Sequence, residues 1–428
     1  MSTYRSVKGM NDLFGDEAAG IIGVEQVFRR LAGTYGAQEV RTPILESKQL
    51  FVRSVGEGTD VVGKEMYAFT DRDGSELVMR PEATASVARM VVQHNLLHTD
   101  PKLRVFYAGP MFRRERPQKG RYRQFHQIGI ECFGEASPVA DIEVIALAHS
   151  LLLELGLDDV VIELGNVGGA DCRPAYLDKL NSFLAQLGDA LPEAARETAA
   201  RNPLRLLDSK DALVQELLAE APLPMDHLSA SHQAHHDALL SGLQALGINV
   251  RVNKRMVRGL DYYCGPVFEA ITQKLGAQAA VLAGGRYDGL LKAVGGADCP
   301  AVGFAGGSER LLLLAQSQRQ TRSRTLGCYL EKEPVNLGVA AAPGANINDL
   351  LKFVTALRSA GVRVASDLSG RSLKAQMKAL HRSACAYVLV LGETEFESNQ
   401  AALRRMADGT TVNISLDFDT VLKAVLED

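Results

Sequence analysis

The chain has 428 residues, of which 46% are hydrophobic and 23% are charged, and its formal net charge at pH 7 is −4. These values are typical of a globular protein with two or three domains, and the acidic balance excludes a generally basic nucleic-acid coat. Any contact with RNA must therefore come from a local basic patch. No stretch approaches the ~20 apolar residues needed to cross a bilayer, and the first residues carry no apolar secretion signal. We therefore expect a soluble, unprocessed cytoplasmic protein with no membrane contact.

The cysteines give no sign of a disulfide framework or of a four-cysteine metal site. They are scattered along the chain without any CxxC pair, which favours a reducing compartment. The six residues are Cys132, Cys172, Cys264, Cys299, Cys328 and Cys385. The sequence accordingly predicts no tightly bound metal.

The first part of the chain alternates helical and strand patterns. Apolar residues recur at spacings of three and four over 17–35, which predicts an amphipathic helix, and a short strand follows at 38–41. A strand at 77–79 leads through a proline-containing turn into a helix that begins near Ser86. Residues 103–134 are typical of two strands joined by a charged loop.

A helical insertion interrupts this pattern at about 170–245, where alanine and leucine are frequent and have helical spacing. Strands resume at Asn249 and continue through 267–269. The glycine-rich run 284–289, taken by itself, favours a hairpin turn. A helix is expected at 308–316.

A polar stretch at 316–325 is typical of a linker between two domains. We place the first domain at 1–325 and the second at 334–428. In the second domain apolar strands alternate with helices, which predicts a small α/β unit with parallel strands. Its strands are expected at 335–341, 362–366 and 386–391, and its helices at 347–360 and 371–384.

The most informative segment is the second strand of the pair at 103–134. Because side chains alternate between the two faces of a strand, Phe125, Gln127 and Glu131 share one face, whereas Ile128 and Ile130 share the other. Burying a carboxyl group and an amide on one strand is costly unless both have partners. The polar face therefore favours a binding site.

The loop before this strand is very basic although the whole chain is acidic. Its cationic residues face a single acidic residue, Glu115. They are Arg113, Arg114, Arg116, Lys119, Arg121 and Arg123. Such a hairpin suits a polyphosphate or a nucleic-acid backbone, and a solvated charged hairpin is the alternative.

Two further segments point to a ligand site. Arg258 begins the string 258–263, and a glycine-rich approach at 303–307 enters a helix that carries Arg310. Glycine lets the backbone come close to a ligand, and a guanidinium group can lie over it. Alone this signal is weak, because glycine-rich strings are common in turns.

Together these strings resemble the class II aminoacyl-tRNA synthetases, and within that class the histidyl-tRNA synthetase family. Residues 112–125 are similar to class motif 2, residues 303–310 to motif 3, and the helical segment leading to Pro43 to motif 1. Strings typical of the family itself stand at 80–84, 202–210, 258–263, 283–290 and 367–374. The resemblance covers essentially the whole chain.

The resemblance implies an α+β fold, in which a class II catalytic domain is built on a mainly antiparallel sheet. The helical insertion interrupts that domain, and a C-terminal α/β anticodon-binding domain follows it. The family forms homodimers that activate histidine with ATP and its bound Mg²⁺, which gives histidyl-adenylate and pyrophosphate. Histidine is then transferred to the 3′ end of tRNA-His.

By the same resemblance, the site residues fall into three groups. Catalysis is assigned to Arg113 and Arg258, on either side of the reacting phosphate. The ATP contacts are Arg113, Glu115, Arg121, Phe125 and Arg310. The histidine contacts are Glu82, Thr84, Gln127, Glu131, Tyr263 and Tyr287.

Two other functions stay open at this stage. A non-catalytic paralogue of the same family would bind histidine as a regulatory subunit of a histidine-biosynthetic ATP phosphoribosyltransferase. The C-terminal domain and the complete set of arginines argue against that function. A class II synthetase for another amino acid is disfavoured by Glu131 and by the pair Tyr262 and Tyr263.

Two polar clusters have no assigned role. His232 and His236 have the i, i+4 spacing of a helical metal pair, but no third ligand at a fitting spacing is evident, which favours a polar helix face. On the helix expected at 371–384, basic residues recur at three and four, as in a solvated face or an RNA contact. They are Arg371, Lys374, Lys378 and Arg382.

Overall fold

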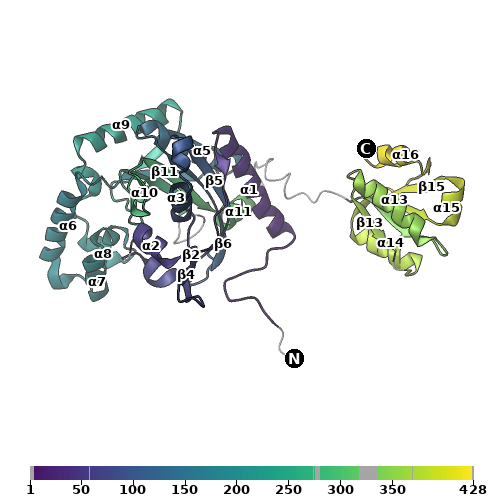
Figure 1. Ribbon diagram of the computed structural model, residues 1–428, viewed down its shortest axis with the longest axis horizontal. Coiled ribbons are helices and arrows are strands. Elements are labelled where there is room, and N and C mark those ends of the chain that lie inside the picture. The colour runs from purple at the N-terminus through teal and green to yellow at the C-terminus, as the bar shows by residue number, and fades with distance from the viewer. Residues whose placement is uncertain are drawn as a thin grey trace. The chain divides into compact units, whose positions relative to one another are not determined.

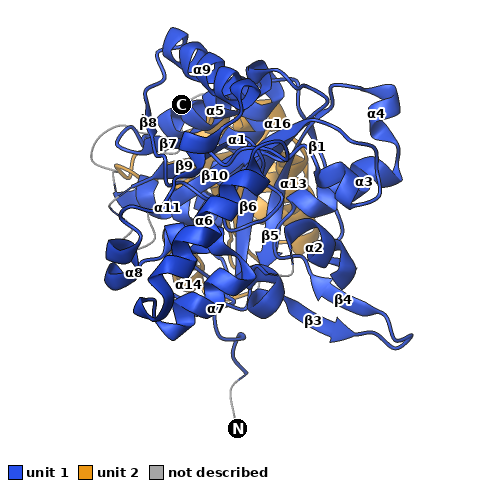
Figure 2. Cartoon of the chain, turned by 90° about the vertical axis from the view of Figure 1, so that its left-hand side faces the viewer, with its two compact units in different colours: residues 1–330 blue, residues 331–428 orange. Residues whose placement is uncertain are grey.

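The computed structural model of the chain forms two compact units, Met1–Leu330 and Glu331–Asp428 (Figures 1 and 2). It describes residues 4–56, 58–272, 274, 280–317, 335–368 and 370–426. The predicted linker at 316–325 lies outside the described residues except for its first two positions. No helix within these ranges is long and apolar enough to cross a membrane.

The described part of unit 1 is built on an eight-stranded sheet with the order β1-β5-β6-β11-β10-β9-β7-β8. The central strands from β5 to β7 pair antiparallel, and only the edge pairs β1·β5 and β7·β8 are parallel. The mainly antiparallel sheet is therefore confirmed. The strands are β1 (Gln38–Glu39), β5 (Arg104–Phe112), β6 (Gln124–Phe133), β7 (Val161–Asn166), β8 (Val250–Val252), β9 (Pro266–Ile271), β10 (Ala280–Arg286) and β11 (Ala301–Gly307).

One face of this sheet packs on helices that supply a large apolar core. The predicted helix at 17–35 is present as α1 (Asp16–Thr34), and its Phe28 meets Phe106 and Phe304 edge to face at 5.9 and 6.0 Å between ring centroids. Ile128 and Ile130 of β6 point into the same core. The other helices on this face are α5 (Pro138–Glu154), α9 (Ala230–Ala245) and α11 (Ser308–Ser317).

The opposite face carries a second apolar cluster, which joins strand side chains such as Val105 and Val267 to helix α3. Helix α3 (Thr84–Gln93) begins two residues before the predicted start at Ser86. A small antiparallel sheet, β2-β4-β3, precedes α3 in the chain and projects from the unit in Figure 2. The remaining elements here are β2 (Leu45–Ser47), α2 (Lys48–Val55), β3 (Tyr67–Thr70), β4 (Glu76–Met79), α4 (Leu96–Thr99) and α10 (Leu290–Ala293).

The hairpin turn expected at 284–289 is wrong for its first half, because Gly284 and Gly285 lie inside strand β10. A Cβ atom on Gly284 would overlap the carbonyl oxygen of Gly303 and lie 2.6 Å from Cβ of Phe304. Gly285 has φ 154°, which L residues rarely adopt. These glycines therefore allow close strand pairing rather than chain reversal.

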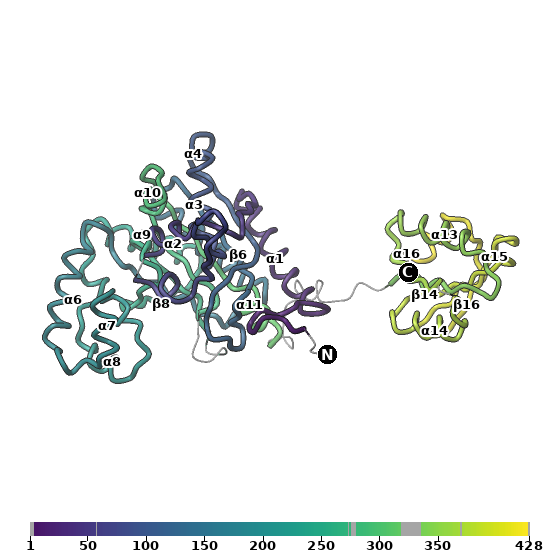
Figure 3. Tube along the Cα trace, turned by 60° about the horizontal axis from the view of Figure 1, so that its bottom comes forward, coloured from purple at the N-terminus to yellow at the C-terminus, as the bar shows by residue number. Residues whose placement is uncertain are grey.

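The insertion has an apolar core of its own. This core includes Tyr176 and Leu180 of α6 together with Leu204 and Leu218, and Figure 3 shows α6 to α8 gathered in one lobe. The last insertion helix, α9, instead packs on α5 through Leu239. The lobe consists of α6 (Arg173–Leu187), α7 (Glu193–Arg201), α8 (Ala212–Leu217) and the 3-10 turns Gly188–Ala190, Pro203–Asp208 and Pro224–His227.

The described part of unit 2 has a five-stranded sheet with the order β13-β12-β14-β15-β16. The three predicted strands are parallel as expected, and β15 and β16, for which the sequence gave no prediction, add an antiparallel edge. Helices α13 and α16 share one apolar cluster with the sheet, and α14 packs in another. The elements are β12 (Val335–Ala341), α13 (Ile347–Ser359), β13 (Val364–Asp367), α14 (Leu373–Arg382), β14 (Cys385–Leu391), α15 (Glu393–Ser398), β15 (Gln400–Arg405), β16 (Thr411–Ser415) and α16 (Phe418–Leu426).

A buried imidazole on α9 makes unit 1 sensitive to acid. His236 is 2% exposed, and neither of its ring nitrogens has a hydrogen-bond partner among the described residues. Burial lowers the pKa of His236 below its ordinary value. As the pH falls, His236 is therefore protonated in the unfolded chain before it is protonated in the folded chain. Above about pH 6.5 the imidazole is neutral in both states and costs no stability, and below that pH the folded chain loses stability relative to the unfolded chain.

We therefore expect His236→Leu to melt at a higher temperature relative to wild type at pH 5.5 than at pH 7.5. The exposed His98→Leu is the control and should show no such difference. Thermal melts at the two pH values measure the effect. An equal offset for His236→Leu at both pH values would contradict the prediction.

Candidate active site

A cavity of about 200 Å³ opens on the face of the sheet opposite the large core. Its wall comes from β6, β10 and β11, from the loop between β5 and β6, from the start of α3, and from residues 258–263. All the site residues singled out from the sequence line it. They are Glu82, Thr84, Arg113, Glu115, Arg121, Phe125, Gln127, Glu131, Arg258, Tyr263, Tyr287 and Arg310.

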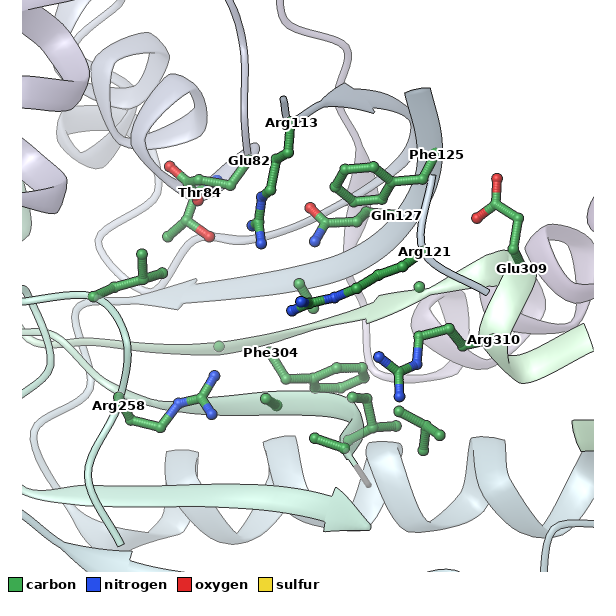
Figure 4. A pocket seen from close by; sticks show the side chains of 18 of the residues that line it. Glu82, Thr84, Arg113, Arg121, Phe125, Gln127, Arg258, Phe304, Glu309 and Arg310 are labelled. Carbon is green, nitrogen blue, oxygen red and sulfur yellow. Dashed lines mark hydrogen bonds between the residues drawn. The ribbon is translucent and has the colours of Figure 1, made fainter. Parts of the chain in front are cut away.

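Strand β6 forms the floor by the alternation that its sequence predicts. Phe125, Gln127 and Glu131 line the cavity, whereas Ile128 and Ile130 lie in the core behind it. The cavity is thus separated from the core by the thickness of one strand. In Figure 4, Phe125 and Gln127 both project from this strand toward the open space.

One end of the cavity is aromatic and surrounds a buried carboxyl group. Glu131 is 1% exposed, and its Oε2 accepts a hydrogen bond from the hydroxyl of Tyr287. Tyr263 lies 6.2 Å from Tyr287 between ring centroids and 4.7 Å from Tyr262. This end can hold a flat polar ring among aromatic faces, with Glu131 available to a donor on that ring.

Burial sets the electrostatics of this end. It raises the pKa of Glu131 to about 8, although the Tyr287 hydroxyl favours the charged form. Without a ligand the carboxyl group is therefore largely protonated at neutral pH. A cation or a strong donor placed against it would restore the charged form, so this end of the cavity selects a ligand with such a group.

Two arginines reach into the cavity from opposite sides (Figure 4). Arg113 donates from Nε to the carbonyl oxygen of Pro81 at 2.9 Å, and its guanidinium carbon lies 5.5 Å from the centre of the Phe125 ring. Arg258 is ion-paired with Glu269. These contacts hold both guanidinium groups in place and leave other N–H groups directed at the cavity.

The other end of the cavity concentrates positive charge. Arg121 pairs with Glu115 at 2.8 Å. Burial, together with the neighbouring Arg121, lowers the pKa of Arg310 to about 10. Cations held this close repel one another, and an anion placed between them relieves that repulsion. The arrangement favours a polyanion such as a phosphate chain.

Glu82 has a structural role in addition to any contact with a ligand. It is 4% exposed, and its two oxygens accept the backbone N–H groups of Thr84 at 2.8 Å and Ala85 at 2.9 Å. It therefore caps the first turn of α3, and it retains acceptor capacity toward the cavity. Oε1 of Gln127 is buried without a hydrogen-bond partner in the described part of the chain.

The sequence assigned no ligand contact to Tyr262, Phe304 and Glu309, which also line the cavity. Both oxygens of Glu309 accept the backbone N–H of His126, at 2.9 and 3.0 Å, and one of them contacts its Nδ1 at 2.9 Å. This contact raises the pKa of His126 and joins α11 to β6. The position of Glu309 beside Arg310 was the only sequence feature that could have indicated its place at the site. Its partner, His126, is 183 residues away in the chain, so the sequence gives no indication of that contact.

The chain matches two family models, one on each unit. The first is described as histidyl-tRNA synthetase and matches residues 9–311, and the second, an anticodon binding domain, matches residues 341–427. The chain belongs to the histidyl-tRNA synthetase family. Every residue of the cavity lies within the first match.

Individual relatives agree with this membership. The chain is 41% identical over 411 residues to a histidine–tRNA ligase of Geobacter metallireducens. This match covers 96% of the chain and 97% of the relative. Among solved structures, the chain resembles the crystal structure of apo histidyl-tRNA synthetase from Staphylococcus aureus, with 27% sequence identity and a TM-score of 0.81. The match covers 99% of this chain and 100% of the Staphylococcus aureus chain.

A further neighbour shares the fold. It is a Bacillus halodurans structure described as an ATP phosphoribosyltransferase regulatory subunit/histidyl-tRNA synthetase. It is 22% identical, has a TM-score of 0.61, and covers 87% of this chain and 95% of its own. At this identity the likeness describes the architecture and says nothing about activity.

The raised pKa of Glu131 predicts that this residue destabilises the fold at alkaline pH. The pKa of Glu131 is higher in the folded chain than in the unfolded chain. Below about pH 4.5 the carboxyl group is protonated in both states and costs no stability; as the pH rises toward 8, the unfolded chain ionises first and the free energy of unfolding falls. Glu131→Gln keeps an acceptor for Tyr287 and removes the titration. Its melting temperature should exceed that of wild type by more at pH 8 than at pH 5.

The free energy of unfolding of Glu131→Gln at pH 8 should exceed that of wild type by at most roughly 4 kcal/mol, since each unit of pKa shift corresponds to ~1.4 kcal/mol. Glu216→Gln, an exposed substitution, is the control and should track wild type at both pH values. A Glu131→Gln offset that does not change with pH would show that Glu131 stays ionised in the empty cavity.

Proposed function

We propose that the chain is a histidine–tRNA ligase, which activates histidine with ATP and then transfers it to the 3′ end of tRNA-His. The observation that carries this proposal is the meeting of two unlike surfaces in one cavity. An aromatic end surrounds Glu131, and a cationic end carries Arg113, Arg121, Arg258 and Arg310. The identity to a histidine–tRNA ligase over 96% of the chain supports it.

The first step is attack by the histidine carboxylate on the α-phosphorus of ATP. A new oxygen–phosphorus bond forms, the bond to the β-phosphate bridge breaks, and pyrophosphate leaves. The carboxylate is already ionised, so the step needs no general base; it needs alignment and neutralisation of charge on phosphate. In this proposal Arg113 and Arg258, which enter from opposite sides, flank that phosphate, and ATP brings its own Mg²⁺.

The rest of ATP would occupy the cationic end. Arg121 would hold the γ-phosphate after exchanging Glu115 for it, and Glu115 would then be free to bind the adenine amino group. The base would lie between the Phe125 ring and the Arg310 guanidinium, both of which line the cavity. Planar groups on both faces of a purine suit stacking and cation–π contact.

Histidine would occupy the aromatic end. Glu131 and Tyr263 would bind the two ring nitrogens of the imidazole, and Tyr287, hydrogen-bonded to Glu131, would line the pocket. The ammonium and carboxylate groups would meet Glu82, Thr84 and Gln127 at the mouth of this end. An amino acid without a ring donor would leave Glu131 buried and unpaired, which costs binding energy.

In the second step a hydroxyl of the terminal ribose of tRNA-His attacks the carbonyl carbon of the adenylate and releases AMP. Holding the RNA is assigned to unit 2, which matches an anticodon-binding model. Lys374, Lys378 and Arg382 are exposed along α14, whereas Arg371 precedes this helix and pairs with Asp367. The exposed stripe is suited to phosphate contacts.

We also propose that the active form is a cytoplasmic homodimer. An open groove of about 470 Å³ lies around α1 and β1, and its lining combines apolar residues such as Leu13, Ile22 and Ile44 with charged ones such as Glu25 and Arg41. Ile22 is 51% exposed and Ile44 is 42% exposed. A second copy of the chain would cover this surface.

Exchange of labelled pyrophosphate into ATP, run with each amino acid in turn, tests the function. Histidine alone should support exchange. A regulatory subunit that only binds histidine would give no exchange with any amino acid, and a synthetase of another specificity would respond to a different one. Either result would overturn the proposal.

Arg258→Ala should lower the histidine-dependent exchange rate by about 100-fold or more, because charge on the reacting phosphate would lose one of its two cations. The melting temperature should stay close to that of wild type. Arg255→Ala is the matched control, since the Arg255 guanidinium group donates to the carbonyl oxygens of Leu218 and Ala219 and lies outside the cavity. Exchange within a few-fold of wild type in Arg258→Ala would refute its catalytic assignment.

The double reversal Lys374→Glu and Lys378→Glu should weaken tRNA binding and lower the salt dependence of that binding by about one or two released counterions. Pyrophosphate exchange should not change, because both lysines lie in unit 2. Lys352→Glu on α13, also exposed, is the control. If the salt slope stays the same, α14 presents only a solvated face.

A further inference from the structure

The structure brings two neighbouring metal-ligating side chains together with a third that lies 60 residues further along the sequence. Asp171, Cys172 and His232 each place one ligand atom so that all three atoms lie within 4.8 Å of one another. Asp171 and Cys172 directly precede α6, and His232 lies in the first turn of α9. His236, the residue that spacing would pair with His232, does not belong to this group.

We propose that Asp171, Cys172 and His232 form a Zn²⁺ site that joins the first and last helices of the insertion. Oδ1 of Asp171 lies 3.2 Å from Nε2 of His232. In a tetrahedral zinc site with bonds of 2.0 to 2.3 Å, neighbouring ligand atoms are about 3.3 Å apart. The oxygen and the nitrogen already have this separation, and the Cys172 sulfur, which lies within 4.8 Å of both, would move to the same centre when zinc binds.

Two consecutive glycines leave the space that this group occupies. A Cβ atom on Gly168 would lie 2.7 Å from Sγ of Cys172, and one on Gly169 would overlap Nε2 of His232. Gly168 also has φ 65°, so a side chain there would strain the backbone. The turn is therefore shaped around the three ligand atoms.

The chemistry of the three groups selects zinc. A thiolate, an imidazole nitrogen and a carboxylate oxygen form a mixed set of borderline ligands, and two negative charges with a neutral imidazole balance Zn²⁺. Three protein ligands leave a fourth position for water. Cys172 is 8% exposed, its thiol lies 3.8 Å from the carbonyl oxygen of Gly169, and it also interacts with the Asp171 carboxylate.

The surroundings orient the carboxylate. The Ser231 hydroxyl lies 3.5 Å from Oδ2 of Asp171, which leaves Oδ1 facing the imidazole. Partners of this kind around the ligands fix their geometry in zinc sites. Without a metal, the Asp171–His232 pair is 49% and 24% exposed, and an ion pair this exposed adds little stability.

The location gives the metal a mechanical role. The backbone N–H of Gly265 donates to the carbonyl oxygen of Gly168 at 3.0 Å, and Arg173 donates to the carbonyl oxygen of Tyr263 at 2.9 Å. The site thus lies against the segment that carries Tyr263 into the cavity. Zinc would hold both ends of the insertion to this segment and restrict movement of the α6–α8 lobe.

The first test measures zinc bound to the full-length protein after treatment with a chelator and equilibration with Zn²⁺. About one tightly bound zinc per chain is expected, with release of the thiol proton. Cys172→Ser and His232→Asn should each weaken binding at least tenfold. Cys385→Ser, another buried cysteine, and His227→Asn are the matched controls and should bind as wild type does. Equal binding by all variants, or no stoichiometric zinc in wild type, would overturn the site.

The second test uses the unmodified chain, so it does not depend on the folding of any variant. Co²⁺ added in place of Zn²⁺ should give the intense visible bands of a tetrahedral ion and a thiolate-to-cobalt charge-transfer band. X-ray absorption at the zinc edge should show a single sulfur neighbour. An ion surrounded by oxygen and nitrogen alone would be bound at surface histidines, and the proposal would fail.

The third test follows the mechanical role separately from charging activity. Hydrogen exchange at 166–173 and 229–236 should slow when Zn²⁺ is added to wild type and stay the same in Cys172→Ser. Circular dichroism without metal establishes that this variant is folded. Slowing of exchange to the same extent in wild type and variant would show that Zn²⁺ acts elsewhere.

Discussion

Strand β6 must satisfy an apolar core on one side and a charged cavity on the other, and the arrangement of unit 1 follows from that constraint. Ile128 and Ile130 bury their side chains under α1 and α11. Gln127, one residue before Ile128, and Glu131, one residue after Ile130, point away from that core and line the cavity. A one-residue shift of register would place a carboxyl group in the core and isoleucines in the cavity, so the pairing of β6 with β5 and β11 is strongly specified.

The cavity is an electrostatic arrangement that is complete only with its substrates. Burial keeps Glu131 largely protonated, and crowding with Arg121 lowers the pKa of Arg310. Both shifts reverse when a donor meets Glu131 and an anion meets the arginines. Binding energy is thus available to ligands that bring a donor to one end and phosphate to the other, which is the arrangement proposed for histidine and ATP in the first step.

Much of this arrangement could be predicted from the sequence because its signals are local. The spacing of apolar residues gave α1, and the alternation along β6 placed Phe125, Gln127 and Glu131 on one face. Strand β10 was harder, since Gly284 and Gly285 are typical of turns and only their contact with the next strand shows why they lie inside a sheet. Helix α5 was also not predicted from the sequence. Its apolar residues lie on most of its faces, so it lacks the one-sided apolar stripe that indicates an amphipathic helix.

What the sequence could not show was the choice of partners across long stretches of chain. Spacing paired His232 with His236 on one helix, but the chain brings Asp171 and Cys172 to His232 and leaves His236 buried without a hydrogen bond among the described residues. Similarly, nothing local to Glu309 indicates His126. Such pairs depend on tertiary packing, and periodicity carries no information about it.

The resting partner of Arg258 has a consequence for turnover. In the proposed reaction, an anion that reaches this arginine would replace Glu269, so the gain in free energy would be the difference between two similar ion pairs. If Arg258 had no carboxylate partner in the empty cavity, it would bind any phosphate group tightly, including the pyrophosphate product. Because Glu269 can take the guanidinium back, the leaving anion does not abandon an unpaired charge. If Arg258 binds phosphate as proposed, the Glu269 carboxylate competes with the anion for it and favours departure of the product.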